Sequence, residues 1–283
     1  MINTNQISIS AVIPCFNHWN SINKAIKSIL LQSVEVFEIL IIDDCSEVPC
    51  PHQKLKEHPK IKIIRLDHNL GRGFCRDLAF KKTSGEFVLN LDATNFIEKN
   101  FIEKALPHFE NPIISAVSGA LFSETKIKSV DRWRSRHLFR EESLKNNLAE
   151  PCSMLITYGT IFRRAAINEV GGFNSKLRFK EDQEMGERLA KKGYQIIGDP
   201  KLKVYASVSN SITEVLERYS RWYMDTDEKP SLKSYLHNLK ASFRPMMEMD
   251  IKDGDWKSAL ISMLAPHFQF FYSIKTYMDR GNT

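Results

Sequence analysis

The chain has 283 residues, of which 42% are hydrophobic and 26% charged, the composition of an ordinary globular protein. Its formal net charge of +6 suits an anionic ligand, but without a long lysine and arginine run it does not indicate nucleic-acid binding. Five scattered cysteines without CxxC spacing argue against a zinc site and a disulfide framework. The sequence has no signal peptide, and no apolar run approaches the roughly 20 residues that a membrane span needs. We therefore expect a cytoplasmic protein, which could also contact the inner face of the membrane peripherally.

The first hundred residues alternate between β-rich runs and amphipathic helical segments. Strands are predicted at residues 7–14, 37–42, 61–66 and 86–91, and helices at 21–32 and 71–82. This order favours an α/β domain with a mainly parallel central sheet flanked by helices. In such sheets ligands bind beyond the carboxyl ends of the strands.

The second half continues this pattern and then becomes helical. Strand character returns at 113–122, 155–163 and 194–197, and helices are predicted at 165–170 and 181–192. The stretch 123–150 is polar and charge-dense, so we expect a long surface excursion there. We therefore expect a domain over residues 1–212 and a helical carboxyl-terminal extension over 213–283.

Three aspartates follow predicted strands, at the edge where an α/β sheet binds its ligands. Asp43 and Asp44 can accept hydrogen bonds from ligand N–H or O–H groups. Asp92 could hold a divalent cation that bridges two phosphates. Aspartate is also common in turns and helix caps, so each residue taken alone is equally compatible with a structural role.

Two predicted helices carry further candidates. Glu181 and Asp182 open one helix, where the positive end of the helix dipole keeps a carboxylate ionised and suited to act as a general base. Arg218 and Arg221 lie three residues apart on another helix, and arginine matches phosphate oxygens. The neighbouring Trp222 could stack on a sugar or fill the core.

Taken in order, these segments resemble glycosyltransferase family 2, which has the A-type glycosyltransferase (GT-A) fold. The likeness covers about residues 7–222, through ISAVIPCFNHWN, FEILIIDDCS, HNLGRGFCRDLAFKKTSGEFVLNLDATN, YGTIFRRAAINEVGGFNSKLRFKEDQEMGERLAKKGYQI and RYSRW. It implies an inverting enzyme that moves a sugar from a nucleotide-diphosphate sugar, expected to be UDP-linked, to an acceptor hydroxyl. The acceptor would be a glycan or lipid-linked molecule in glycan, polysaccharide or glycolipid synthesis.

The resemblance also assigns roles to residues. The donor-binding residues that it implies are Pro14, Asn17, Asp43, Asp44, Arg76, Asp92, Thr94, Arg221 and Trp222. Among them, Asp44 matches the base-binding aspartate and Asp92 the first aspartate of the Asp-x-Asp motif. Asp182 matches the catalytic base, with Glu181 beside it.

The sequence departs from the family at the expected metal ligands. Thr94 replaces the second aspartate of Asp-x-Asp, and the stretch 204–211 has no histidine where many members carry one. A divalent cation, Mn²⁺ or Mg²⁺, would have Asp92 and, weakly, Thr94 as ligands. Three interpretations of the missing metal ligands stay open: the metal binds weakly, cationic side chains replace it, or the protein has lost its donor chemistry. The third interpretation gives the alternative function, a catalytically impaired GT-A protein that binds a nucleotide-sugar or a protein partner.

The residues after the first strand disfavour two other enzyme classes, and two further segments are candidate surfaces. The first strand is followed by PCFNHWN, without glycine, which disfavours a nucleotidyltransferase and a Rossmann dehydrogenase. The arginine-rich segment 131–140 could hold an anionic acceptor, although a solvated surface is favoured. The aromatic segment 267–280 could form an interfacial helix, although packing on the catalytic domain or on a second subunit of a homo-oligomer is favoured.

Overall fold

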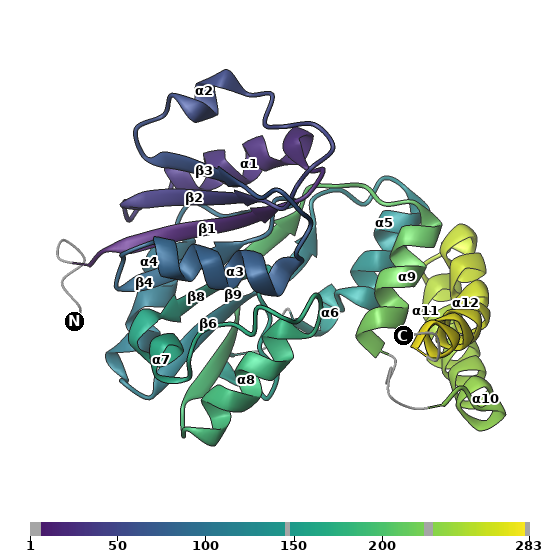
Figure 1. Cartoon of the computed structure of the whole chain (residues 1–283). Helices are drawn as coiled ribbons and strands as arrows, with labels where there is room; N and C mark the ends of the chain where they lie inside the picture. Colours follow the sequence, from purple (N-terminus) through teal and green to yellow (C-terminus); the bar gives the residue numbers. More distant parts are fainter. Residues whose placement is uncertain (1–6, 145–147, 224–228, 281–283) are drawn as a thin grey trace. The chain divides into compact units, whose positions relative to one another are not determined.

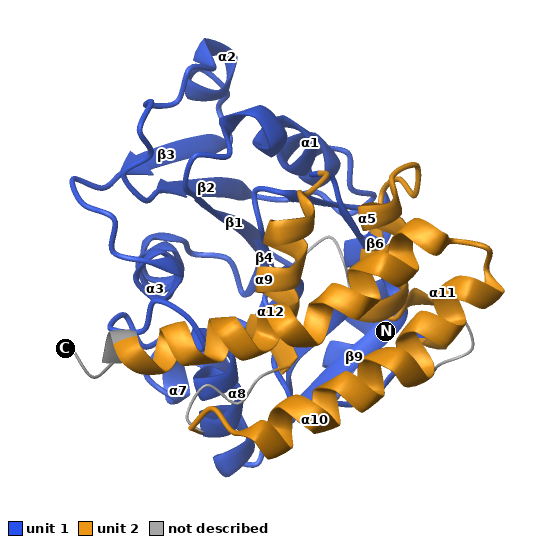
Figure 2. Ribbon diagram, turned by 90° about the vertical axis from the view of Figure 1, so that its right-hand side faces the viewer, with its two compact units in different colours: residues 1–122, 144–208 blue, residues 123–143, 209–283 orange. Residues whose placement is uncertain are grey.

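The computed structural model describes residues 7–144, 148–223 and 229–280. The chain divides into two compact units, coloured separately in Figure 2. Unit 1 comprises residues 1–122 and 144–208, and unit 2 comprises residues 123–143 and 209–283. The segment 123–143 thus groups with the carboxyl-terminal helices, although the sequence suggested a surface excursion of the first domain.

Unit 1 is built on one mixed sheet. Its strands are β1 (Ile9–Cys15), β2 (Glu38–Asp43), β3 (Ile61–Arg65), β4 (Phe87–Leu91), β5 (Asn95–Ile97), β6 (Ile114–Ser123), β7 (Glu150–Pro151), β8 (Gly159–Arg163) and β9 (Gln195–Ala206). Their order is β3-β2-β1-β4-β8-β6-β9-β5, with β7 paired to β9. The pairings among β3, β2, β1 and β4 are parallel, whereas β8 is antiparallel to β4 and β6, and β9 to β5 and β7. The expected parallel arrangement therefore holds for the first four strands, and the later strands run antiparallel.

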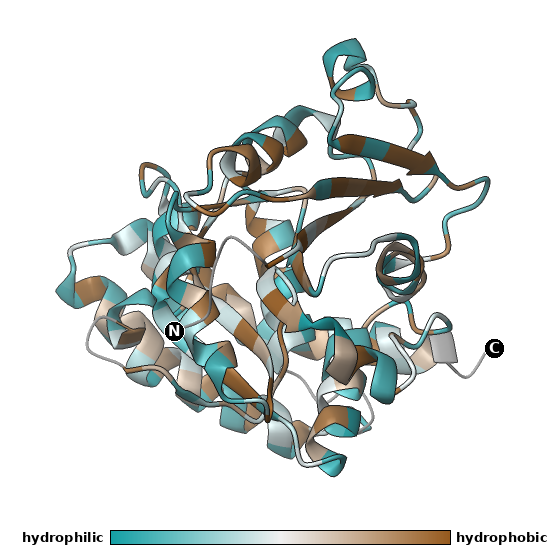
Figure 3. Cartoon of the chain, turned by 90° about the vertical axis from the view of Figure 1, so that its left-hand side faces the viewer, coloured by the Kyte–Doolittle hydropathy of each residue, from teal (hydrophilic) through white to brown (hydrophobic). Residues whose placement is uncertain are grey.

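Helices cover the sheet of unit 1 (Figure 1). They are α1 (Trp19–Leu30), α2 (Gln53–Lys56), α3 (Arg72–Lys82), α4 (Phe101–Ala105), the 3₁₀ helix η2 (Leu106–Glu110), α7 (Arg164–Glu169) and α8 (Glu181–Lys191). On one face, Val12 and Leu40 pack in a single core cluster with Ala79 and Phe80 of α3. The strands β1 and β2, which carry these residues, are apolar along most of their length, as expected of strands that are covered on both faces (Figure 3).

Strand β9 is much longer than the predicted strand at 194–197. The second half of β9 alternates between buried and exposed residues, with Leu202 and Val204 inside and Lys201 and Lys203 outside. A strand with one wet face carries charges at every second position. The apolar-run criterion that identified β1, β2 and β4 therefore missed most of it.

Unit 2 is helical. It contains α5 (Ser129–Trp133), the π-helix η3 (Arg134–Leu138), most of α6 (Glu141–Leu144), α9 (Ile212–Tyr223), α10 (Leu232–Ala241), the π-helix η4 (Ser242–Met247), α11 (Glu248–Lys252) and α12 (Trp256–Arg280). The helical character predicted beyond residue 213 is confirmed. Its core joins Val130 and Trp133 to Val215 on α9 and to Ile261 and Ala265 on α12. Within the described residues, no helix is both long and apolar enough to cross a membrane.

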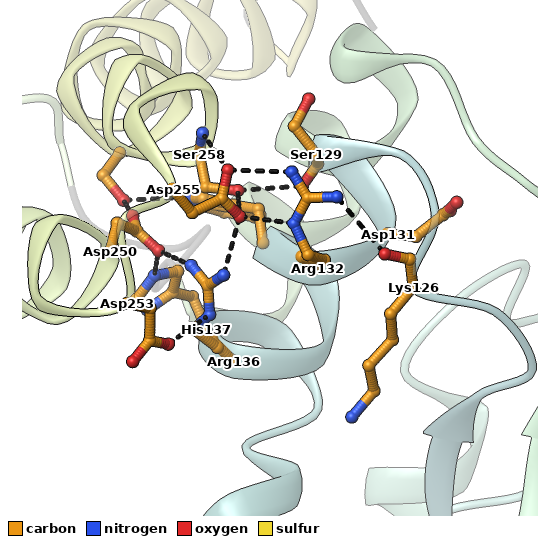
Figure 4. Close-up of polar contacts among 12 residues, drawn as sticks. Lys126, Ser129, Asp131, Arg132, Arg136, His137, Asp250, Asp253, Asp255 and Ser258 are labelled. Atoms are coloured by element: carbon orange, nitrogen blue, oxygen red, sulfur yellow. Dashed lines mark hydrogen bonds and ion pairs between the residues drawn. The ribbon is translucent and has the colours of Figure 1, made fainter.

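The prediction that the arginine-rich segment 131–140 is solvated is wrong. Arg132 donates to the carboxylate of Asp255 at 2.6 and 2.9 Å, and Arg136 pairs with Asp250 and Asp255 (Figure 4). His137 lies 2.9 Å from the same Asp250 carboxylate. Arg132, Arg136 and His137 are therefore paired with carboxylates more than a hundred positions later in the sequence rather than left to solvent.

Candidate active site

The carboxylate of Asp44 holds the start of α3. Its Oδ1 accepts a hydrogen bond from the backbone N–H of Leu70 at 2.7 Å, and its Oδ2 accepts one from Gly71 at 2.9 Å. The side chain is almost fully buried. Burial, followed by the charge of Asp44, raises the pKa of the neighbouring Cys75 thiol far above its usual value, so this cysteine stays protonated. Asp44 thus anchors the loop before α3, and its predicted contact with a nucleotide base stays a prediction.

Asp43 closes the turn after β2. It accepts hydrogen bonds from the backbone N–H of Ser46 at 2.9 Å and from the guanidinium of Arg65 at 2.6 Å. The hydroxyl oxygen of Ser46 in turn accepts a hydrogen bond from the backbone N–H of Asn17, an exposed residue shortly after β1. Pro14, near the end of β1, lies beside β2 in the sheet. These predicted donor-binding residues therefore share one edge of unit 1, formed by the carboxyl ends of β1 and β2.

The centre of the site is a charge cluster of two arginines and three carboxylates. Arg76, fully buried on α3, donates to Glu181 and, at 3.0 Å, to Oδ1 of Asp92. One turn earlier on α3, Nε of Arg72 lies 3.7 Å from the Glu181 carboxylate. Partial burial lowers the pKa of Arg72, but the charges of Glu181, Asp92 and Asp182 raise it by more, so its pKa is above the usual value. The carboxylates of the cluster therefore keep the Arg72 guanidinium charged.

The two predicted catalytic carboxylates differ sharply in accessibility. Glu181 is fully buried, and its second carboxylate oxygen has no hydrogen-bond partner in the described structure. Asp182 is only partly buried, and its Oδ1 accepts the N–H of Gln183 at 3.0 Å. Its Oδ2 lies 3.4 Å from the hydroxyl of Thr157. Asp182 is therefore the accessible carboxylate of the pair, whereas Glu181 is the buried partner of Arg76.

The residues expected to bind a divalent cation do not form a complete site. Oδ1 of Asp92 is already paired with Arg76, and Thr94 offers only a neutral hydroxyl. The stretch 204–211 at the end of β9 has no histidine, and its Ser207 donates to the backbone carbonyl of Thr94 at 2.8 Å. In the part of the chain that the structure describes, no three histidine, cysteine or acidic side chains are grouped to hold a metal. The protein side chains alone therefore do not fit a resident cation.

Arg221 and Trp222 belong to unit 2. Arg221 lies 4.0 Å from Glu217, one turn earlier on α9, and both side chains are half exposed. Trp222 is 46% exposed, and the centre of its ring lies 6.2 Å from that of Phe139, so it does not fill the core. Their predicted contact with the donor stays a prediction.

Arg72 is a candidate that the sequence analysis missed. It precedes Arg76 by four positions, so on a helix both side chains lie on one face. Half of its side chain is exposed, whereas that of Arg76 is fully buried. The four-residue spacing was visible in the sequence and could have identified it.

Residues 10–171 of the chain match the model of glycosyl transferase family 2. An N-acetylglucosaminyltransferase of Bradyrhizobium diazoefficiens is 24% identical over 246 residues, which cover 77% of this chain and 49% of that protein. A poly-beta-1,6-N-acetyl-D-glucosamine synthase of Staphylococcus aureus is 21% identical over 252 residues, covering 87% of this chain and 61% of the synthase. The chain thus spans about half to three fifths of the length of these relatives.

Solved structures share the fold. A mannosyltransferase from Pyrobaculum calidifontis, in complex with GDP-Man and Mn²⁺, has a TM-score of 0.61 at 15% identity, covering 96% of this chain and 88% of that chain. Residues 1–349 of S. aureus TarS, in complex with UDP-GlcNAc, have a TM-score of 0.55 at 18% identity, covering 96% and 89%. The predicted GT-A fold is confirmed.

Proposed function

Since the chain belongs to glycosyl transferase family 2, we propose that it transfers a sugar from a UDP-linked donor to a hydroxyl of a glycan or lipid-linked acceptor, with inversion at the anomeric carbon. Relatives named as an N-acetylglucosaminyltransferase and a poly-N-acetylglucosamine synthase support a role in polysaccharide or glycan synthesis. The complex of a structural neighbour with UDP-GlcNAc makes this nucleotide-sugar the first donor to test.

Asp182 is the proposed general base. It is the accessible member of the Glu181–Asp182 pair and lies in the first turn of α8, where the helix dipole favours the ionised carboxylate. In the proposed step, Asp182 takes the proton of the acceptor hydroxyl while the hydroxyl oxygen bonds to the anomeric carbon. The bond from that carbon to the diphosphate oxygen breaks, and the nucleoside diphosphate leaves with the electron pair. Attack in line with the leaving group inverts the anomeric configuration.

Arginines supply the positive charge that the departing diphosphate needs. The observation that carries this part is the pairing of Arg76 with Asp92, which occupies the carboxylate expected to bind a metal. Arg76 is fully buried, so we assign it a positioning role. Arg72, half exposed and one turn away on α3, is then the guanidinium that contacts the phosphate oxygens.

The test compares Asp182→Asn with Glu187→Gln, an exposed carboxylate on the same helix. With UDP-GlcNAc as donor and an oligosaccharide acceptor, we expect Asp182→Asn to abolish UDP release while calorimetric binding of UDP is unchanged. Glu187→Gln should retain both. Full activity of the Asp182→Asn enzyme would remove this residue from the mechanism.

A further inference from the structure

The segment 156–158, which leads into β8 in unit 1, is held by side chains at three consecutive backbone carbonyls. The amide of Asn90 on β4 donates to the carbonyl of Thr157. The amide of Asn95 on β5 donates to the carbonyl of the following residue at 3.2 Å. The hydroxyl of Thr160 on β8 donates to the carbonyl of the preceding residue at 2.6 Å. Bonds to three strands of the sheet therefore restrict the backbone of this segment.

Asn90 holds its place in this arrangement at a cost. Its side chain is fully buried, and its Oδ1 has no hydrogen-bond partner among the described residues. A buried polar atom without a partner is unfavourable, and an apolar side chain would avoid this cost. Its Nδ2, in contrast, donates to the carbonyl of Thr157. An asparagine at this position is therefore better explained by the placement of Thr157 than by stability alone.

The side chain of Thr157 faces the proposed general base. Thr157 is only 3% exposed, and its hydroxyl lies 3.4 Å from Oδ2 of Asp182. Oδ1 of the same carboxylate accepts the backbone N–H of Gln183 at 3.0 Å. Hydrogen bonds between catalytic groups are often long before substrate binds. With a donor at each oxygen, the plane of the Asp182 carboxylate is set from two sides.

We propose that Thr157 is a positioning residue for Asp182, and that Asn90 positions Thr157 in turn. The inference rests on the proposed transferase function, because the role requires Asp182 to take the proton of the acceptor hydroxyl. A general base acts only from a narrow range of geometries. Loss of the Thr157 hydroxyl therefore lowers turnover and leaves binding of the donor unchanged.

Two substitutions in the full-length protein separate the hydroxyl of Thr157 from its packing. Thr157→Val keeps the branched shape and removes the hydroxyl, whereas Thr157→Ser keeps the hydroxyl and removes a methyl group. With UDP-GlcNAc and an oligosaccharide acceptor, we expect Thr157→Val to lower kcat for UDP release about tenfold or more, with the donor KM unchanged. Thr157→Ser should retain most of the parent kcat.

The control and the second residue use the same assay. Thr83→Val removes another buried hydroxyl of unit 1, which donates to the carbonyl of Ala79, and should leave kcat unchanged. Asn90→Leu removes the amide that holds Thr157 and should lower kcat as Thr157→Val does, while thermal unfolding reports whether the variant is folded. An Asn90→Leu protein that is folded and fully active would remove Asn90 from the inference.

The backbone amide of Gln183 reports on the same carboxylate without turnover, because it donates to Asp182. In ¹H–¹⁵N NMR spectra its signal can be assigned by comparison with Asp182→Asn. We expect Thr157→Val to shift this signal and Thr157→Ser to leave it close to its position in the parent protein. An unshifted signal in Thr157→Val would overturn the positioning contact.

Two kinetic outcomes would also overturn the inference. The first is equal kcat for Thr157→Val and the parent protein. The second is a greater loss of kcat in Thr157→Ser than in Thr157→Val, since packing rather than the hydroxyl would then be what matters. A parent protein that releases no UDP would instead contradict the proposed transferase function, and the Gln183 signal would then decide the positioning contact by itself.

Discussion

Arg76→Met provides the sharpest test of the charge cluster in unit 1. Methionine roughly keeps the volume of the side chain but removes its charge, which leaves Glu181 as a fully buried carboxylate. Removing one partner of a buried ion pair costs about 3–5 kcal/mol, and Arg72 at 3.7 Å offsets only part of this. For a unit of this size we expect the melting temperature of unit 1 to fall by roughly 6–20 °C. Differential scanning calorimetry can follow this transition.

The double variant Arg76→Met with Glu181→Leu separates buried charge from lost packing. Replacing both members of a buried pair by apolar residues is often neutral or stabilising. Asp92, whose side chain is 29% exposed, remains solvated in this variant. We therefore expect the double variant to recover most of the stability lost in Arg76→Met, while UDP release stays low because Asp92 and Arg72 have lost their positioning. A double variant as unstable as the single one would refute the role of the ion pair.

Three further predictions concern other contacts. Arg72→Gln should weaken UDP binding, measured by calorimetry, about tenfold or more, because it removes the proposed contact with the phosphate. Thermal stability should change little, because the Arg72 side chain is half exposed. Unchanged UDP binding would contradict the assigned phosphate contact. Gly73→Ala should destabilise unit 1 by about 1–3 kcal/mol in denaturant unfolding, because the new Cβ would lie 2.3 Å from the carbonyl oxygen of Leu177; an unchanged midpoint would mean that this loop yields. The hydrogen bond from Arg132 is the main cause that lowers the pKa of Asp255 in the folded protein, so Asp255 stabilises unit 2 above its unfolded pKa of about 3.9 and loses this contribution as the pH falls. Asp255→Asn should therefore be less stable at pH 7, and circular dichroism should show a shallower loss of its stability below about pH 4. An acid unfolding profile identical to that of the parent protein would contradict this.

The sequence was most informative where burial alone determines structure. The strands β1, β2 and β4 are covered on both faces, so they appear as continuous apolar runs such as FEILII. The carboxylates that follow these runs necessarily lie at the sheet edge, which is why Asp43, Asp44 and Asp92 could be placed there in advance. What each carboxylate contacts depends on loops that the pattern does not describe.

The parts that could not be predicted depend on partners distant in sequence. The segment 131–140 looks solvated because its arginines are charged, and only the fold brings Asp250 and Asp255 to them. Likewise, Glu181 and Asp182 are equivalent as an acidic first turn. In the fold, Glu181 is the buried partner of Arg76 and Asp182 is the accessible carboxylate. This difference arises because α8 packs against α3, which brings together Arg76 and Glu181, 105 positions apart in the sequence.

The most direct test of the central claim is calorimetric binding of UDP-GlcNAc to the full-length protein in EDTA and in Mn²⁺, with UDP release measured in the same two buffers. The account predicts binding and turnover in EDTA, with little gain from Mn²⁺, because Arg72, positioned by the cluster around Arg76, supplies the charge at the diphosphate. Binding that requires Mn²⁺ would contradict the arginine assignment. Absence of binding in both buffers would contradict the proposed transferase function itself.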